Sequence, residues 1–89
     1  MKLLKIKVYG EVQDVGYRIE AKRMADELGV RGFAQNQPDG SVYLEAEGDE
    51  HKLDIFLDWC RSGTPFSTVT KVEHEFSDKT KIFSEFKVI

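Results

Sequence analysis

Apolar and polar residues alternate near the start of the chain and then change period. Residues 4–8 place Leu4, Ile6 and Val8 on one face, which predicts a strand with a single apolar side. Over residues 17–28 the apolar positions recur at helical spacing instead, and Gly29 is placed to end that helix. We therefore expect a strand, a short connection and an amphipathic helix.

The second part of the chain repeats this change of period. Residues 30–48 predict a hairpin that turns at Pro38-Asp39-Gly40. Asp49 is placed to cap a second helix. Residues 62–65 end that helix, and two further strands are expected around residues 72–76 and 82–88. The buried stripe expected for the second helix consists of Leu53, Phe56, Leu57 and Cys60.

The predicted order is therefore β-α-β-β-α-β with one extra C-terminal strand. This order is typical of the α+β class, and within that class it is typical of the ferredoxin-like split β-α-β sandwich. We expect an antiparallel sheet of four main strands plus a short C-terminal strand, with both helices on one face.

Composition narrows the class of protein. With 89 residues, the chain is expected to form one domain over residues 1–89. A formal charge of -3 argues against general nucleic-acid binding, which needs a basic surface. No apolar run is long enough for a membrane span, and the lone Cys60 allows neither an intrachain disulfide nor a thiolate metal cage. We expect a cytoplasmic protein without a membrane association.

The segment 10–18 carries the most specific chemistry. It reads Gly-Glu-Val-Gln-Asp-Val-Gly-Tyr-Arg and joins the first strand to the first helix. A helix N-terminus offers free backbone N–H groups and positive potential to an anion. Arg18 adds a planar, permanently charged fork that suits phosphate or carboxylate. These residues predict a site for a small anionic ligand.

Two segments together resemble the acylphosphatase family. Segment 10–18 resembles the family's loop after the first strand, and segment 32–42, with Asn36 before a turn, resembles its second signature. The resemblance covers essentially the whole chain. It implies an enzyme that hydrolyses the carboxyl-phosphate bond of small-molecule acyl phosphates to a carboxylate and inorganic phosphate. It implies no metal and no organic cofactor.

The resemblance also implies a role for each part of the site. We call residues 13–18 the phosphate loop. The backbone N–H groups of this loop and the guanidinium of Arg18 are expected to hold the phosphoryl oxygens. Asn36 is expected to orient the attacking water, because an amide both donates and accepts hydrogen bonds. Inorganic phosphate is expected to act as product and competitor, and the protein to be a monomer. The loop residues expected to bind substrate through their backbone are Gln13, Asp14, Val15, Gly16 and Tyr17.

One position departs from the family pattern. Asp14 stands where the family usually has glycine, so a residue with Cβ must adopt a conformation that glycine adopts freely. We expect its carboxylate to point outward and to cap its own loop through an Asx-type hydrogen bond. We expect Gln13 to lie at the rim and to contribute only its N–H, and the ring of Tyr17 to pack under the helix.

Three other functions fit parts of this pattern. An anion-binding module with impaired turnover would keep the loop, but it would not need Asn36. An RNA-binding sheet shares the order of elements, and Arg31-Gly32-Phe33-Ala34 begins like its aromatic motif, but the apolar continuation is missing. A maturation-factor role fits because related domains also occur within larger carbamoyl-transfer proteins.

Overall fold

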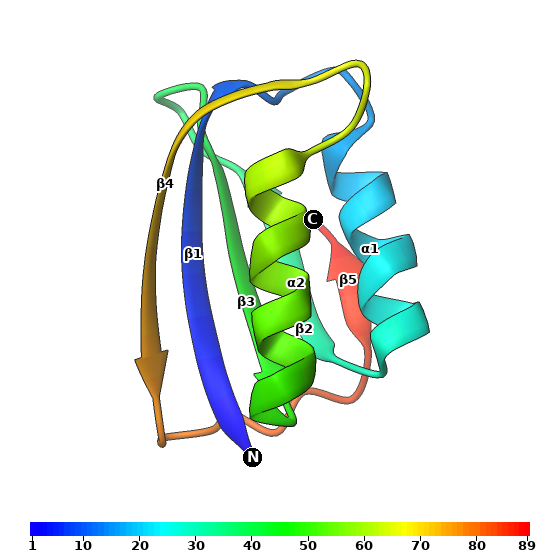
Figure 1. Ribbon diagram of the computed structural model, residues 1–89, viewed down its shortest axis with the longest axis vertical. Helices are drawn as coiled ribbons and strands as arrows, with labels where there is room; N and C mark the ends of the chain where they lie inside the picture. The colour runs from blue at the N-terminus through cyan, green and yellow to red at the C-terminus, as the bar shows by residue number, and fades with distance from the viewer.

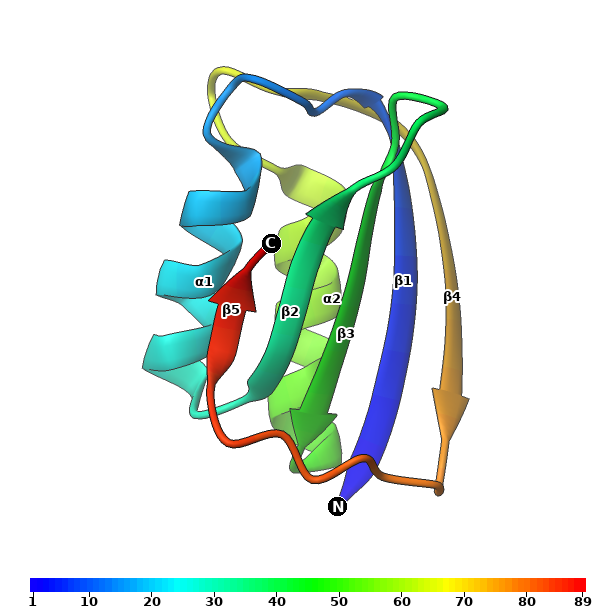
Figure 2. The ribbon, with the colours of Figure 1, turned by 180° about the vertical axis from the view of Figure 1, so that it is seen from behind.

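The computed structural model describes residues 1–89 as a layer of two helices on a five-stranded sheet (Figures 1 and 2). The predicted order of elements is confirmed. The strands stand side by side in the order β4-β1-β3-β2-β5, and both helices lie on the same face. The elements are β1 (Lys2–Glu11), α1 (Tyr17–Leu28), β2 (Arg31–Asn36), β3 (Val42–Gly48), α2 (Glu50–Ser62), β4 (Thr68–Ser77) and β5 (Phe86–Val88).

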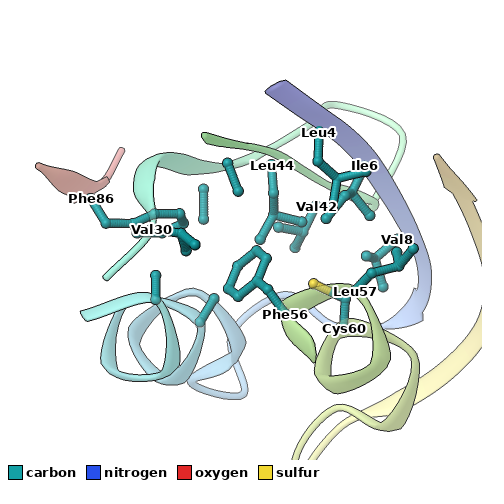
Figure 3. Close-up of a cluster of buried hydrophobic side chains, with 14 of the residues drawn as sticks. Leu4, Ile6, Val8, Val30, Val42, Leu44, Phe56, Leu57, Cys60 and Phe86 are labelled. Atoms are coloured by element: carbon teal, nitrogen blue, oxygen red, sulfur yellow. The ribbon is translucent and has the colours of Figure 1, made fainter. Parts of the chain in front are cut away.

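The predicted apolar faces meet in one core between sheet and helices (Figure 3). Leu4, Ile6 and Val8 of β1 point toward α2, while the lysines between them are only partly buried. The expected stripe of α2 is buried completely or nearly so. Burial of these side chains is the main favourable contribution to folding, at about 1.5–3 kcal/mol for each large apolar residue.

The helix ends also form as predicted. Gly29 adopts a left-handed conformation, with φ of 75°, and its N–H donates to the last turn of α1. The carboxylate of Asp49 accepts hydrogen bonds from the N–H groups of His51 and Lys52 at the start of α2. Neither helix is both long and apolar enough to cross a membrane.

The C-terminal strand differs from the prediction in direction and in length. Strand β5 pairs in parallel with β2, so the sheet is mixed and the expectation of a wholly antiparallel sheet is wrong at this edge. The strand expected over residues 82–88 begins only at Phe86. Glu47 explains the shortening, because its carboxylate accepts the N–H groups of Lys81, Ile82 and Phe83 at 2.6, 3.1 and 2.8 Å. Those N–H groups are therefore not available to a strand partner.

Candidate active site

The connection between β1 and α1 leaves its backbone donors free. None of the N–H groups of residues 13–18 donates a hydrogen bond to another protein atom. Gly16 occupies the N-cap position with φ of 78°, and it has no side chain with which to cap the helix. The start of α1 therefore offers uncapped donors, aided by the helix dipole, to an anion.

Glycines make this conformation possible at two points. Gly16 supplies the left-handed turn into α1. Gly10 lies where β1 shifts register against β4, and a Cβ atom there would lie 2.0 Å from the carbonyl oxygen of Thr68. Only glycine permits that approach, so Gly10 fixes the path by which the chain leaves the sheet and enters the phosphate loop.

Asp14 adopts the glycine-like conformation that the family pattern predicts for its position. Its φ is 62°, which an aspartate tolerates better than most residues. The residue is exposed, as expected, but its carboxylate accepts no hydrogen bond, so the predicted Asx cap is absent. Asp14 and Arg18 line the same small hollow, which has a volume of about 190 Å³.

The side chain of Gln13 joins the phosphate loop to the β2–β3 turn. Its Nε2 donates to the carbonyl oxygens of Gln37 and Ser41 at 2.8 and 2.9 Å. The expectation that only the backbone of Gln13 matters is therefore wrong. A single amide can donate two hydrogen bonds at once, and both acceptors here belong to the turn that begins directly after Asn36.

Asn36 ends β2 with an unpaired polar atom. It pairs in the sheet with Val42, and its Oδ1 is buried without any hydrogen-bond partner. A buried polar atom normally has a partner, because leaving one unpaired costs about 1–3 kcal/mol. Asn36 therefore keeps hydrogen-bonding capacity at the end of β2 that no protein group uses.

Arg18 lies in the first turn of α1, where a cation is disfavoured by the helix dipole. Its guanidinium is held by one hydrogen bond, from Nη1 to the backbone oxygen of Ile89 at 2.5 Å. The remaining donors of the fork make no further hydrogen bond to the protein. Arg18 is therefore oriented by the segment that follows β5 and retains donors for an anion.

Tyr17 anchors the start of α1 in the core, as predicted. Its ring is 1% exposed, its hydroxyl donates to the carbonyl oxygen of Cys60 at 2.9 Å, and its ring centroid lies 5.1 Å from that of Trp59. Burial raises the pKa of Tyr17 above its usual value. The side chain of Tyr17 therefore packs in the core, and Tyr17 can contribute only its backbone N–H to the phosphate loop.

The structure holds no cluster of three or more histidine, cysteine, aspartate or glutamate side chains suited to a metal ion. The available chemistry consists of backbone donors, one guanidinium and one amide. On an α+β sandwich, this set of groups is suited to binding an anion, and the chemistry that it can supply is positioning and charge stabilisation.

Comparison with known proteins gives a specific family for this chain. The sequence model of the acylphosphatase family matches residues 4–88. An acylphosphatase from Methylococcus capsulatus is 45% identical over 89 residues, which are 100% of this chain and 97% of that protein. An acylphosphatase from Thermotoga maritima is 49% identical over 75 residues, which are 84% and 83% of the two chains. The crystal structure of acylphosphatase from Bacillus subtilis superposes with a TM-score of 0.97 at 34% identity, covering 100% of this chain and 99% of that one.

The chain therefore belongs to the acylphosphatase family. The family resemblance inferred from segments 10–18 and 32–42 is confirmed.

Proposed function

We propose that Arg18, Asn36 and the backbone N–H groups of the phosphate loop together perform the reaction of this enzyme. The protein is an acylphosphatase: it hydrolyses the carboxyl-phosphate bond of small-molecule acyl phosphates to a carboxylate and inorganic phosphate. The alternative of an anion-binding module with impaired turnover is not favoured, because the relatives matched over most of the chain are acylphosphatases.

The phosphoryl group binds first to fixed donors. The free N–H groups of residues 13–18 and the guanidinium of Arg18 hold its oxygens and stabilise the charge that spreads over them in the transition state. These donors are already in place before substrate binds, so little reorganisation is required at the moment of reaction.

Asn36 orients the water for attack in line with the leaving group. The water oxygen forms a bond to phosphorus while the bond from phosphorus to the acyl oxygen breaks, and the electron pair leaves with the carboxylate. The proton of the attacking water passes to the phosphoryl group, which departs as inorganic phosphate. No protein base is required, since the substrate accepts the proton itself.

The unpaired Oδ1 of Asn36 supports this assignment most directly, because no protein group uses it and a rotation of the side chain would bring this buried atom to the water. Binding of an anion needs only donors, and an unpaired acceptor would add repulsion. An acceptor at this point is useful for a water molecule, whose two hydrogens need partners while its lone pair faces phosphorus.

Hydrolysis of benzoyl phosphate, followed by absorbance in the presence of EDTA, tests these roles. We expect Arg18→Ala to lower kcat/KM by about 10²–10³ and to abolish competition by inorganic phosphate, because charge-assisted hydrogen bonds are lost. We expect Asn36→Ala to lower kcat by at least about 10² while phosphate still raises the melting temperature.

Matched controls lie close by in the chain. Arg31→Ala removes an exposed arginine, and Gln35→Ala removes an exposed amide next to Asn36 in β2. Both variants should keep kcat and KM within about twofold of the parent, as substitutions at exposed positions usually do. Full turnover by Asn36→Ala would show that another group positions the water.

Four further expectations stay predictions. These are the monomeric state, the role of inorganic phosphate as competitor, the cytoplasmic location and the organisation of residues 1–89 as one domain. Sedimentation, product inhibition, cell fractionation and the cooperativity of unfolding test them in that order.

A further inference from the structure

A groove of about 410 Å³ lies beside the phosphate loop. One wall consists of Val15, Gly16 and Ile19, and the other consists of Trp59 and residues 63–66. The segment after α2 passes over the N-terminal end of α1 in both ribbon views, which brings these walls together (Figures 1 and 2). We call this feature the acyl groove. Its volume falls within the range of small-molecule sites, about 300–1,000 Å³.

The acyl groove adjoins the hollow that contains Arg18. Gly16 and Ile19 line both. A ligand whose phosphate lies against Arg18 therefore reaches the groove by passing over these two residues. No other hollow of comparable size shares residues with the phosphate loop.

The large side chains at the mouth of the groove are apolar and exposed. Ile19 is 66% exposed and Phe66 is 80% exposed. The charged side chains that line the groove are paired with each other, with Arg23 Nε 2.8 Å from Glu20 Oε2. The groove therefore offers apolar contact and an aromatic ring, without an unpaired charge that would select a polar group.

The in-line course of phosphoryl transfer favours a leaving group on this side. In phosphoryl transfer the attacking and leaving oxygens lie roughly in line on opposite sides of phosphorus. Gln13, the first residue of the phosphate loop, contacts the turn that follows Asn36, whereas Val15 and Gly16, farther along the loop, line the acyl groove. Water from the side of Asn36 would expel the acyl group toward the groove.

We propose that the acyl groove binds the acyl portion of the substrate and selects acyl phosphates with an apolar, ring-sized acyl group. This inference rests on the proposed function and adds to it a determinant of substrate class. The phosphate loop recognises the group that all acyl phosphates share, and the groove distinguishes among them by the apolar surface that each one buries.

The test compares two substrates that differ only in the acyl group. Benzoyl phosphate carries an aromatic ring, and acetyl phosphate carries a methyl group too small to fill the groove. In the parent protein we expect a kcat/KM for benzoyl phosphate at least about tenfold above that for acetyl phosphate, since buried apolar surface is favourable.

Ile19→Ala and Phe66→Ala remove apolar surface from the groove without opening the core, because both side chains are exposed. Each should lower the benzoyl-to-acetyl ratio of kcat/KM by about three- to tenfold, mainly through KM for benzoyl phosphate. For Phe66→Ala, the inhibition constant of inorganic phosphate should stay within about twofold, because Phe66 does not line the hollow that contains Arg18. Ile82→Ala is the matched control, since Ile82 is 82% exposed and lies outside the groove.

The outcomes separate this inference from the proposed function. If acetyl phosphate is hydrolysed but neither groove variant changes the benzoyl-to-acetyl ratio, the inference is overturned and the proposed function stands. An equal loss for both substrates also overturns it, because the residues then affect the phosphate site in general. A Phe66-dependent dimer in sedimentation would assign the groove to a second copy of the chain. If the parent hydrolyses neither substrate, both the inference and the proposed function fail.

Discussion

Arg18 Nη1 donates a hydrogen bond to the backbone oxygen of Ile89, so the residue expected to hold phosphate is itself held by the segment directly after β5. The N–H of Ile89 in turn donates to the carbonyl oxygen of Ala34 at 2.9 Å, which ties this segment to β2. The parallel edge strand β5 thus places an acceptor beside the guanidinium. Because one donor of the Arg18 guanidinium is already hydrogen-bonded, the side chain loses less rotamer freedom on binding an anion than a free arginine would.

Deletion of Ile89 should therefore weaken phosphate binding. We expect KM for benzoyl phosphate and the inhibition constant of phosphate to rise together by about three- to tenfold, which corresponds to the loss of one orienting hydrogen bond of about 1 kcal/mol. Ile89→Ala keeps the backbone carbonyl and should resemble the parent. Equal effects of the two variants would show that the side chain of Ile89, rather than its carbonyl, supports Arg18.

Gln13 should influence turnover through the β2–β3 turn. Gln13→Ala removes two hydrogen bonds to that turn, so we expect a loss of about 1–2 kcal/mol in stability and a fall of about tenfold in kcat, with a smaller change in KM. Gln13→Glu should lower both stability and kcat further than Gln13→Ala does, because it places a carboxylate against two carbonyl oxygens. Chemical denaturation and steady-state kinetics measure the two effects separately.

A variant with similar destabilisation elsewhere serves as the control for Gln13. Tyr43→Phe removes the hydrogen bond from the Tyr43 hydroxyl to Glu45, away from the phosphate loop. It should lose stability and retain kcat. A parallel fall of kcat in Tyr43→Phe would show that the effect of Gln13→Ala reflects stability alone.

Asp14 should affect substrate binding only weakly at physiological salt. Its side chain is exposed, and screening reduces its repulsion of a bound phosphate. We expect Asp14→Gly to lower KM by less than about threefold at 0.15 M salt and by more at low salt. Asp14→Asn removes the charge but keeps a side chain that tolerates positive φ, so it separates charge from conformation. A tenfold fall in KM at 0.15 M salt in both variants would place the carboxylate against the phosphate.

Cys60 should be unreactive in the native protein. It is completely buried, and burial raises the pKa of its thiol from 9.0 to about 12. At pH 8 we expect alkylation by iodoacetamide to be slower than that of free cysteine by about 10³ or more, and to become rapid in denaturant. Complete labelling of the native protein within minutes would contradict this.

The raised pKa of Cys60 also has a consequence for stability. The folded state keeps the thiol proton that the unfolded state releases near pH 9.0. The stabilising contribution is therefore fully present below pH 9.0 and declines as the pH rises from there toward about 12. Cys60→Ala should show a shallower loss of stability over this range in denaturation at successive pH values.

The phosphate loop illustrates what could be predicted from sequence. The conformation of Gly16, the exposure of Asp14 and the buried ring of Tyr17 all follow from local rules of backbone freedom and from helical spacing. The two hydrogen bonds from Gln13 could not be predicted in this way, because their acceptors lie 24 and 28 residues farther along the chain. No periodicity relates such positions.

The C-terminal edge of the sheet could not be assigned correctly from its pattern. Residues 82–88 alternate as a strand does, but the carboxylate of Glu47 captures the N–H groups of residues 81–83 and leaves only Phe86–Val88 to pair with β2. Alternation reports which face of a segment is apolar. It does not report whether distant side chains compete for the backbone donors.

From the amino-acid sequence alone we could derive the order of elements, the class of fold, the family and the choice of Arg18 and Asn36 as candidate site residues. These follow from period, turn chemistry and motif spacing, which act over a few residues. The three-dimensional arrangement was needed to show that Ile89 holds Arg18, that Gln13 joins the phosphate loop to the turn after Asn36, and that the acyl groove opens beside Gly16. Each of these depends on where the sheet and the helix ends bring distant segments together, and that placement is fixed by packing of the shared core.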